Sequence, residues 1–349
     1  MRCPLALLTL TVPAVLTAQN PERITLDGRE VAVYNLVGRL TVIGGTSDKV
    51  IVEVTRAGRD AGKLKLETGD VRGRSALRIR YPEDRIYYAD VRWNGRTNFT
   101  IGDDGTFGDN TNNRGRWDTG RRIEVSSRDG LDAHADLKVF VPKGKTLFLR
   151  QGVGETSIEN VDGHLDVDVS ASHVRVAHVR GSLTIATGSG GVDVTDMLGD
   201  LRLDSGSGGA ALDGIRGGSL SLDVGSGSLR GRALDVSDIK ADVGSGGVRL
   251  TAVKTPRFRL ETGSGSTEVE FLVAPDDVNI EAGSGGVTLR LPSSLSASVD
   301  IETGSGGIDS DFEVKLARVE RRALRGTIGS GRGRITVESG SGSVRLLKL

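Results

Sequence analysis

The sequence predicts an all-β fold, a β-solenoid (β-helix-like) whose rungs of 18–21 residues turn at Gly-Ser corners. The first support is a Gly-Ser cluster that recurs through the second half of the chain, because such a period is typical of stacked repeats. The first glycines of successive clusters are Gly188, Gly206, Gly225, Gly244, Gly263, Gly283 and Gly304. Apolar and polar residues alternate on both sides of each cluster, as in strands with one buried face. Aromatic residues make up only 4% of the chain, which suits a narrow core of Leu, Ile and Val.

Residues 1–18 are predicted to be a secretory signal peptide. Arg2 gives a positive start, residues 5–16 are apolar, and a Leu-Thr-Ala site precedes Gln19. The single cysteine, Cys3, lies inside this segment, so the mature chain would have no thiol for a disulfide, a metal or catalysis. No later apolar run reaches the length of a membrane span. We therefore expect an exported protein, in the periplasm, at the outer surface or secreted.

Residues 19–134 are predicted to form less regular β-rich rungs that carry an insertion at about 81–120. Alternating strands are predicted within 38–58 and 76–84, whereas the insertion breaks the pattern and gathers aromatic residues beside Asp, Asn and Arg. Two interpretations stay open. The insertion either caps the open N-terminal rung or binds a glycan or another partner. The candidate partner-binding residues are Tyr87, Tyr88, Trp93, Phe107 and Trp117.

Residues 135–349 are predicted to form the regular part of the solenoid. Each unit has one strand before the Gly-Ser cluster, a second strand after it, and a turn rich in Gly, Asp and Pro. Glycine suits such a corner because it adopts positive φ and lets stacked backbones approach closely. A flexible linker would not recur in step with strands, and the phosphate-loop pattern GxxxxGK[ST] is missing. The aspartate of a calcium-binding turn, Asp193, is not kept, since Ala211 and Arg230 occupy the matching positions in later units.

The stretch ADLKVFVPKGKTLFLRQGVGETSIENVDGHLDVDVSASHVRV at 135–176, followed by TGSGG units, resembles the bacterial putative-adhesin family. This family is a domain of unknown function, related to the head domain of putative autotransporter adhesins. The matching pattern is an apolar strand, a Pro-Lys/Gly turn and repeats that end in G-x-(I/V)-x-(I/V), and residues 35–58 are similar to the start of the family. The resemblance covers most of the mature chain and implies a right-handed β-solenoid in the cell envelope, with no catalytic residues. The chain departs from the pattern at 81–120 and near 310–333.

A column of carboxylates is predicted along one outer face. The residue two positions before each cluster's first glycine is acidic in six successive units, and stacking in register would align these residues about 4.8 Å apart. They face solvent and are neutralised by neighbouring basic columns, or they form a strip for a divalent cation such as calcium or a cationic partner. The six are Asp204, Asp223, Asp242, Glu261, Glu281 and Glu302, and the neighbouring basic residues are Arg202, Lys240, Arg249, Arg259 and Arg290. Apart from this strip, the sequence predicts no metal and no cofactor.

No catalytic constellation is evident in the sequence, so we expect no enzyme. The corner serines have no histidine at a constant offset, and HExxH spacing is missing. Three of the four histidines could approach one another if they lay on adjacent rungs, although surface histidines of an early rung are the simpler interpretation. The four are His134, His164, His173 and His178.

We expect a non-catalytic exported cell-envelope protein, an adhesin-like binding or scaffold module that presents a solenoid face to a protein or glycan partner. The alternative is a polysaccharide-active enzyme, a hydrolase or lyase that uses carboxylates on a β-helix groove. Basic and acidic residues both number 46, so we expect neither nucleic acid nor an anionic membrane as a partner. The C-terminal strand at 343–349 shows no obvious cap, which adds the option of self-association through an exposed edge.

Overall fold

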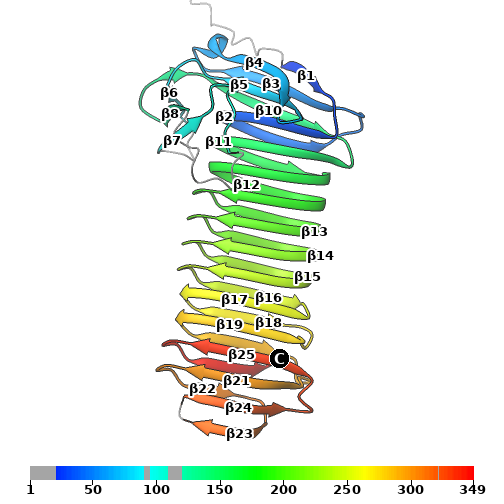
Figure 1. Cartoon of the computed structure of the whole chain (residues 1–349), viewed down its shortest axis with the longest axis vertical. Coiled ribbons are helices and arrows are strands. Elements are labelled where there is room, and N and C mark those ends of the chain that lie inside the picture. The colour runs from blue at the N-terminus through cyan, green and yellow to red at the C-terminus, as the bar shows by residue number, and fades with distance from the viewer. Residues whose placement is uncertain (1–20, 90–94, 109–119, 321) are drawn as a thin grey trace, which may run out of the picture.

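The protein is a rod of stacked strands with a small second sheet beside its N-terminal end (Figure 1). The computed structural model describes residues 21–89, 95–108, 120–320 and 322–349, so the predicted signal peptide, Trp93 and Trp117 lie outside the described residues. Within these residues, twenty-two strands form one mostly parallel sheet and four strands form the second. Within the described ranges the one helical element is the 3-10 turn η1 (Ala61–Lys63), and no helix there is both long and apolar enough to cross a membrane. The predicted all-β fold is confirmed, and the predicted right-handed winding stays a prediction.

Antiparallel strands close the N-terminal end of the rod. β2 pairs in parallel with β11 on one side and with β5 and β10 on the other. β3 then pairs antiparallel with both β1 and β10, and β4 pairs antiparallel with β5. Changing the strand direction ends the parallel ladder, which would otherwise present an open edge to other chains. These elements are β1 (Glu22–Leu26), β2 (Glu30–Gly44), β3 (Val50–Ala57), β4 (Lys65–Val71), β5 (Arg74–Arg80), β10 (His134–Val141) and β11 (Lys145–Glu159).

The segment predicted as an insertion contributes to a folded second sheet. Its strands are β6 (Arg85–Tyr87), β7 (Arg96–Ile101), β8 (Arg121–Ser126) and β9 (Leu131–Asp132), in the order β7-β8-β6-β9. Phe99, Ile123 and Val125 of this sheet are buried and belong to the same hydrophobic core as the rod. The insertion contributes β6 and β7 to this sheet, and its described part is packed against the first rungs together with β8 and β9, which follow it in the chain.

Parallel rungs follow one another in register along the middle of the rod. Partners such as Leu183, Leu201 and Leu220 occupy the same place in successive repeats, so the inward residues form ladders of Leu, Ile and Val. Each strand pairs with its counterpart in the next rung. These strands are β12 (Asp162–Thr187), β13 (Val192–Ser205), β14 (Ala210–Val224), β15 (Leu229–Val243), β16 (Val248–Lys254), β17 (Arg257–Ser264), β18 (Thr267–Phe271), β19 (Asp277–Ser284) and β20 (Val287–Leu291).

Each rung has three sides, which we name by their place in the repeat. Around the Gly-Ser corner that follows β13, the first side is the strand before the corner (199–205) and the second side is the strand after it (210–213). The third side is the short stretch that returns the chain to the next first side (215–217). At the Gly-Ser corners the backbones touch: a Cβ added at Gly190 would lie 1.6 Å from the carbonyl oxygen of Ser172. Close stacking explains why glycine recurs at this corner.

The C-terminal strands do not stack in chain order. β25 (Gly333–Ser339) lies between β19 and β21 (Ala297–Thr303), and β26 (Val344–Lys348) lies between β20 and β22 (Ile308–Ser310). An antiparallel hairpin, β23 (Val314–Glu320) and β24 (Ala323–Ile328), covers the free edge of β21 (Figure 1). The prediction that the strand at 343–349 offers an exposed edge is therefore wrong, because β26 is paired on both sides.

Candidate functional site

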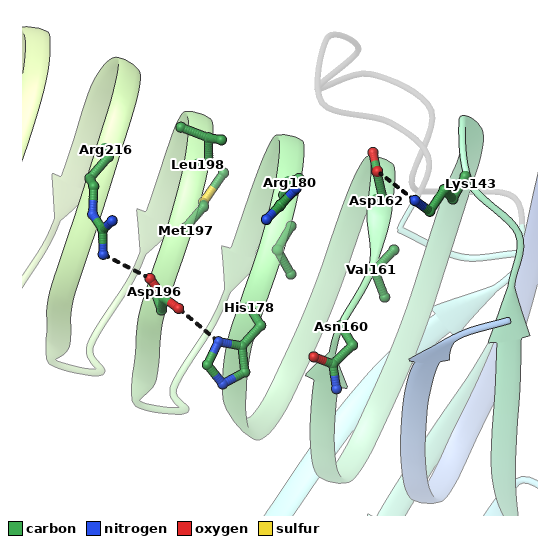
Figure 2. Close-up of a pocket in the computed structure, with 11 residues that line it drawn as sticks. Lys143, Asn160, Val161, Asp162, His178, Arg180, Asp196, Met197, Leu198 and Arg216 are labelled. Atoms are coloured by element: carbon green, nitrogen blue, oxygen red, sulfur yellow. Dashed lines mark hydrogen bonds and ion pairs between the residues drawn. The ribbon is translucent and has the colours of Figure 1, made fainter.

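A shallow groove runs along the third side of the early rungs and crosses the rod's strands (Figure 2). Its volume is about 570 Å³, and it is open to solvent along its length. One wall is the row of corner residues between the second and third sides, and the other wall is the row of outward residues on the third side. The lining residues are Lys143, Asn160, Val161, Asp162, His178, Val179, Arg180, Asp196, Met197, Leu198 and Arg216.

The corner row consists of residues in the left-handed backbone conformation. Asn160, His178 and Asp196 have φ values of 56°, 55° and 52°. Asn, Asp and His are the non-glycine residues most tolerant of this region, which accounts for their place here. In later rungs the same corner is taken by Gly214 and Ala233, which present no polar side chain. The polar part of this row, as far as the described chain shows it, therefore spans three successive rungs.

One carboxylate at the centre of the groove, Asp196, links its own rung to the rungs on both sides of it. The Nδ1 atom of His178 and the Oδ2 atom of Asp196 are joined by a hydrogen bond of 2.8 Å. Arg216 donates from its guanidinium to Oδ1 of the same carboxylate at 3.1 Å. This pairing fixes the plane of the imidazole and leaves its Nε2 atom for a ligand (Figure 2).

The outer row of the groove holds basic, acidic and apolar side chains, and one of its basic side chains has no charged partner among the described residues. The ammonium of Lys143 lies 3.9 Å from the carboxylate of Asp162. Arg180 comes next in the row and has no side-chain hydrogen bond or ion pair to any residue that the structure describes. Leu198 follows, with 50% of its surface exposed, and then Arg216. The groove thus carries three basic and two acidic side chains and an excess of one positive charge at neutral pH.

The predicted acidic column exists on the first side of the rungs, but its order is corrected by the strand pairing. Glu281 is next to Glu338 and not next to Glu302, because β25 separates β19 from β21. Seven carboxylates in succession therefore lie along the rod, and the five from Asp242 onward line a second open hollow of about 710 Å³. In spatial order they are Asp204, Asp223, Asp242, Glu261, Glu281, Glu338 and Glu302.

Asp223, one carboxylate of the column, lies between Asp204 and Asp242. Desolvation raises the pKa of Asp223, and the neighbouring carboxylates Asp204 and Asp242 raise it further. At the C-terminal end Arg325 forms ion pairs with Asp300 and Glu302. Among the described residues no group of three or more His, Cys, Asp or Glu is arranged to hold a metal ion. The calcium and cationic-partner interpretations of the column stay predictions.

Two of the basic residues predicted to neutralise the column lie on another side of the rod. Arg249 and Arg290 project from the second side and pair with Glu268 at 2.7 and 3.3 Å. The alternation of apolar and polar residues within a strand predicts that these side chains point outward. It does not specify on which side of the rung they lie. Arg202, Lys240 and Arg259 do lie on the first side, on the same strands as the carboxylates.

The described aromatic residues of the predicted partner-binding set differ in their exposure. Tyr88 is 5% exposed and packs edge-to-face against the ring of His134 at 5.3 Å. Phe107 is half-buried and packs against Tyr34 and Phe99, so it covers the first rungs. Tyr87 is also half-buried and remains a candidate for surface contact. The burial of Tyr88 removes its ring from any surface patch.

His164, His173 and His178 lie at different places in the repeat, and each is hydrogen-bonded to a residue of the next rung. The sequence analysis did not identify the pairing of His178 with Asp196. His164 bonds Ser182 at 2.7 Å and His173 bonds Asp193 at 2.9 Å, each on the next rung. His178 bonds Asp196 in the same way, which is a spacing of one rung and so was visible in the sequence. The missing signal was the corner itself, because the left-handed conformation decides which way these side chains project.

A continuous parallel stack with glycine corners and a groove along one side defines a β-solenoid repeat protein. Residues 133–347 match the Toastrack DUF4097 family, so the chain belongs to that family. The match includes the stretch 135–176 and confirms the resemblance found in the sequence. No curated protein matches the chain.

Two solved structures can be aligned with most of the chain. A putative cell adhesion protein from Clostridium sporogenes is 10% identical, with 94% of this chain and 100% of that chain covered and a TM-score of 0.22. A putative adhesin from Parabacteroides distasonis is 13% identical, with 94% and 96% covered and a TM-score of 0.37. The assignment to the family rests on the sequence match, because both structural likenesses are remote.

Proposed function

We propose that the protein is a non-catalytic, adhesin-like module of the cell envelope that binds a partner along the lateral groove. The observation that carries this proposal is the groove's row of exposed polar side chains. In it His178 and Asp196 are held in place, and Arg180 has no partner among the described residues. Solenoids bind through extended lateral surfaces of this kind, since each rung repeats the same scaffold.

The rigidity of the scaffold supports a binding role. Val161, Val179 and Met197 beneath the groove are at most 1% exposed, so the polar side chains above them stand on a packed floor. A preorganised surface loses little conformational entropy when a ligand binds. The groove is also shallow and open, whereas catalytic sites commonly enclose the substrate and exclude bulk water.

Binding is tested with the mature chain, residues 19–349, immobilised and exposed to a bacterial cell-envelope extract split into protein and polysaccharide fractions. We expect one fraction to be retained by the parent chain and lost by a variant that combines Arg180→Gln with Leu198→Ser. The matched control is Arg202→Gln, an exposed arginine on the first side of the rod. Equal retention by the groove variant and the control contradicts the proposal.

Export is part of the same proposal and is supported by the signal-like residues 1–18. A fusion of residues 1–25 to a phosphatase that is active only outside the cytoplasm should give enzyme activity, whereas replacing the apolar residues 5–16 with a polar sequence should abolish it. Activity without the apolar segment would show that these residues are not the signal.

A further inference from the structure

We propose that the lateral groove binds an acidic polysaccharide that carries a carboxylate on every second sugar, with Arg180 as the principal contact. This proposal rests on the proposed function and names the class of partner for the same groove. Three features carry it: the unmatched charge of Arg180, the spacing of the outer row, and the fixed polar side chains of the corner row.

Arg180 supplies a cation that the described part of the chain leaves without a partner. The flanking basic residues are matched, since Lys143 lies 3.9 Å from Asp162 and Arg216 bonds Asp196 at 3.1 Å. In Figure 2 Arg180 lies between the Asp162 pair and Leu198 with no contact marked to either. A guanidinium offers two parallel N–H donors, which suits a carboxylate better than any neutral group.

The spacing of the outer row matches a chain of sugars. Arg180, Leu198 and Arg216 are direct register partners on three successive rungs. Rungs lie about 4.8 Å apart, which is close to the length of one pyranose ring in an extended chain. A sugar on each rung would place one acidic sugar over Arg180, a neutral sugar over Leu198 and the next acidic sugar over Arg216, whose guanidinium has N–H donors besides the one bonded to Asp196. Leu198, half exposed, presents an apolar surface to the C–H face of that neutral sugar.

The corner row supplies hydrogen bonds along the other edge of the same ligand. His178 keeps its Nε2 atom free of Asp196, and the Asn160 side chain lines the groove one rung away. These groups accept from or donate to sugar hydroxyls without reorganising, because the Asp196 carboxylate fixes the imidazole. The ligand would therefore be held between a cationic row and a hydrogen-bonding row.

The acidic column disfavours an acidic polymer on the first side of the rungs. The seven stacked carboxylates lie on the first side of the rungs, where they repel a polyanion. The groove on the third side has an excess of one positive charge, so it attracts an acidic chain that the column on the first side repels.

The test measures binding of defined polysaccharides to the mature chain by isothermal titration calorimetry at low ionic strength. The probes are hyaluronate oligomers, with an acid on every second sugar, polygalacturonate oligomers of the same length, with an acid on every sugar, and neutral dextran. We expect hyaluronate to bind tightest, polygalacturonate more weakly because Leu198 would face a carboxylate, and dextran not to bind.

Variants assign the contacts. Arg180→Gln should weaken hyaluronate binding by about tenfold or more, as expected for the loss of a charge-assisted pair. Leu198→Ser should narrow the preference for hyaluronate over polygalacturonate. Arg202→Gln, the control on the first side, should change the affinity by less than about twofold. Circular dichroism checks that each variant folds, and all three substitutions are at exposed positions.

The outcomes separate this proposal from the proposed function. Equal hyaluronate affinity for Arg180→Gln and Arg202→Gln, or no hyaluronate binding at all, overturns the acidic-polysaccharide assignment. If the groove variant still loses the envelope fraction in that case, the groove binds another class of partner and the proposed function stands. If the envelope fraction is also unaffected by the groove variant, both proposals fail.

Discussion

Glu281 and Glu338 are neighbours in the sheet although β20 to β24 lie between them in the chain, because β25 is paired directly with β19. The strand that follows Glu281 in the repeat, β21, is displaced by one position and pairs with the far edge of β25. The C-terminal strands β25 and β26 are thus interior members of the stack.

The interior position of β26 predicts an unequal effect of two adjacent leucines. Leu346 is 0% exposed and lies between Leu289 and Ser310, whereas Leu347 is half-buried. Leu346→Ala should lower the free energy of unfolding by about 2–5 kcal/mol, as for other buried leucines, and Leu347→Ala by much less. Urea denaturation followed by circular dichroism measures both. Two small and similar losses would indicate that the last strand is a frayed edge.

The contact of stacked corners predicts that adjacent glycines of one cluster differ in tolerance. A Cβ at Gly306 would lie 2.0 Å from the carbonyl oxygen of Gly342, whereas a Cβ at Gly307 meets nothing within 4 Å. Gly306→Ala should therefore destabilise the protein by at least about 2 kcal/mol through overpacking. Gly307→Ala should be neutral or slightly stabilising, because alanine restricts the unfolded chain. Thermal unfolding compares them, and equal melting temperatures would contradict the stacking of these two corners.

The raised pKa of Asp223 predicts stability that falls as the pH rises. The folded state holds this proton more tightly than the unfolded state, so the contribution is full below the usual Asp pKa of 3.8 and is lost as the pH passes the raised value. Asp223→Asn keeps the uncharged form at every pH. It should melt at a higher temperature than the parent near pH 7 and at a similar temperature near pH 3. A variant that is less stable than the parent at pH 7 would show that the column does not repel itself.

Asp200, on the same side of the rod, has a pKa that is shifted in the opposite direction, so its effect on stability has the opposite dependence on pH. The N–H and hydroxyl of Ser219 donate to its carboxylate at 2.8 and 3.0 Å and lower its pKa. Its contribution is present above the usual pKa of 3.8 and is lost as the pH falls through the lowered value. Asp200→Ala should therefore reduce the melting temperature near pH 7, and this loss should shrink below pH 3. A loss that is independent of pH would mean that the charge of Asp200 plays no part.

The buried hydroxyl of Tyr81 predicts a cost for its removal. The hydroxyl lies 3.0 Å from both Asn35 Oδ1 and Val37 O and accepts the Val37 N–H at 3.3 Å. Tyr81→Phe would leave buried polar groups without partners and should cost about 1–3 kcal/mol of unfolding free energy. Tyr87→Phe, at a half-buried position, is the control and should be nearly neutral. Equal stability of the two variants in urea would contradict the role assigned to this hydroxyl.

Spacing and alternation were enough to predict the stack from β12 to β20, since each rung there depends on its neighbour in sequence. They could not predict the order β19-β25-β21. Residues 297–303 and 333–339 have the same alternation, and Glu302 and Glu338 fit the same column equally well. Which of the two strands pairs with β19 depends on long-range contacts, and the spacing of the repeats along the sequence does not specify them.

In the candidate site, too, one feature was predictable from the sequence and another was not. The acidic column followed from a constant offset to the glycines, so its side of the rung was predictable. The groove could not be predicted in this way, because the number of residues from His178 to Asp196 differs from the number from Asp196 to Arg216. A carboxylate that joins a corner residue to a third-side residue has no fixed spacing, and the direction of each side chain depends on the backbone conformation at the corner.

The interleaving of β25 and β26 imposes an order of assembly on the chain. Rungs as far as β20 can be added one at a time as the chain emerges, since each contacts the rung that immediately precedes it in sequence. β21 and β22 cannot take their final places until residues 333–348 have arrived and paired with β19 and β20. The C-terminal rungs can therefore form only after β25 and β26 have been synthesised. A chain truncated before β25 would keep the residues of the groove but lack the two strands through which β21 and β22 join the stack.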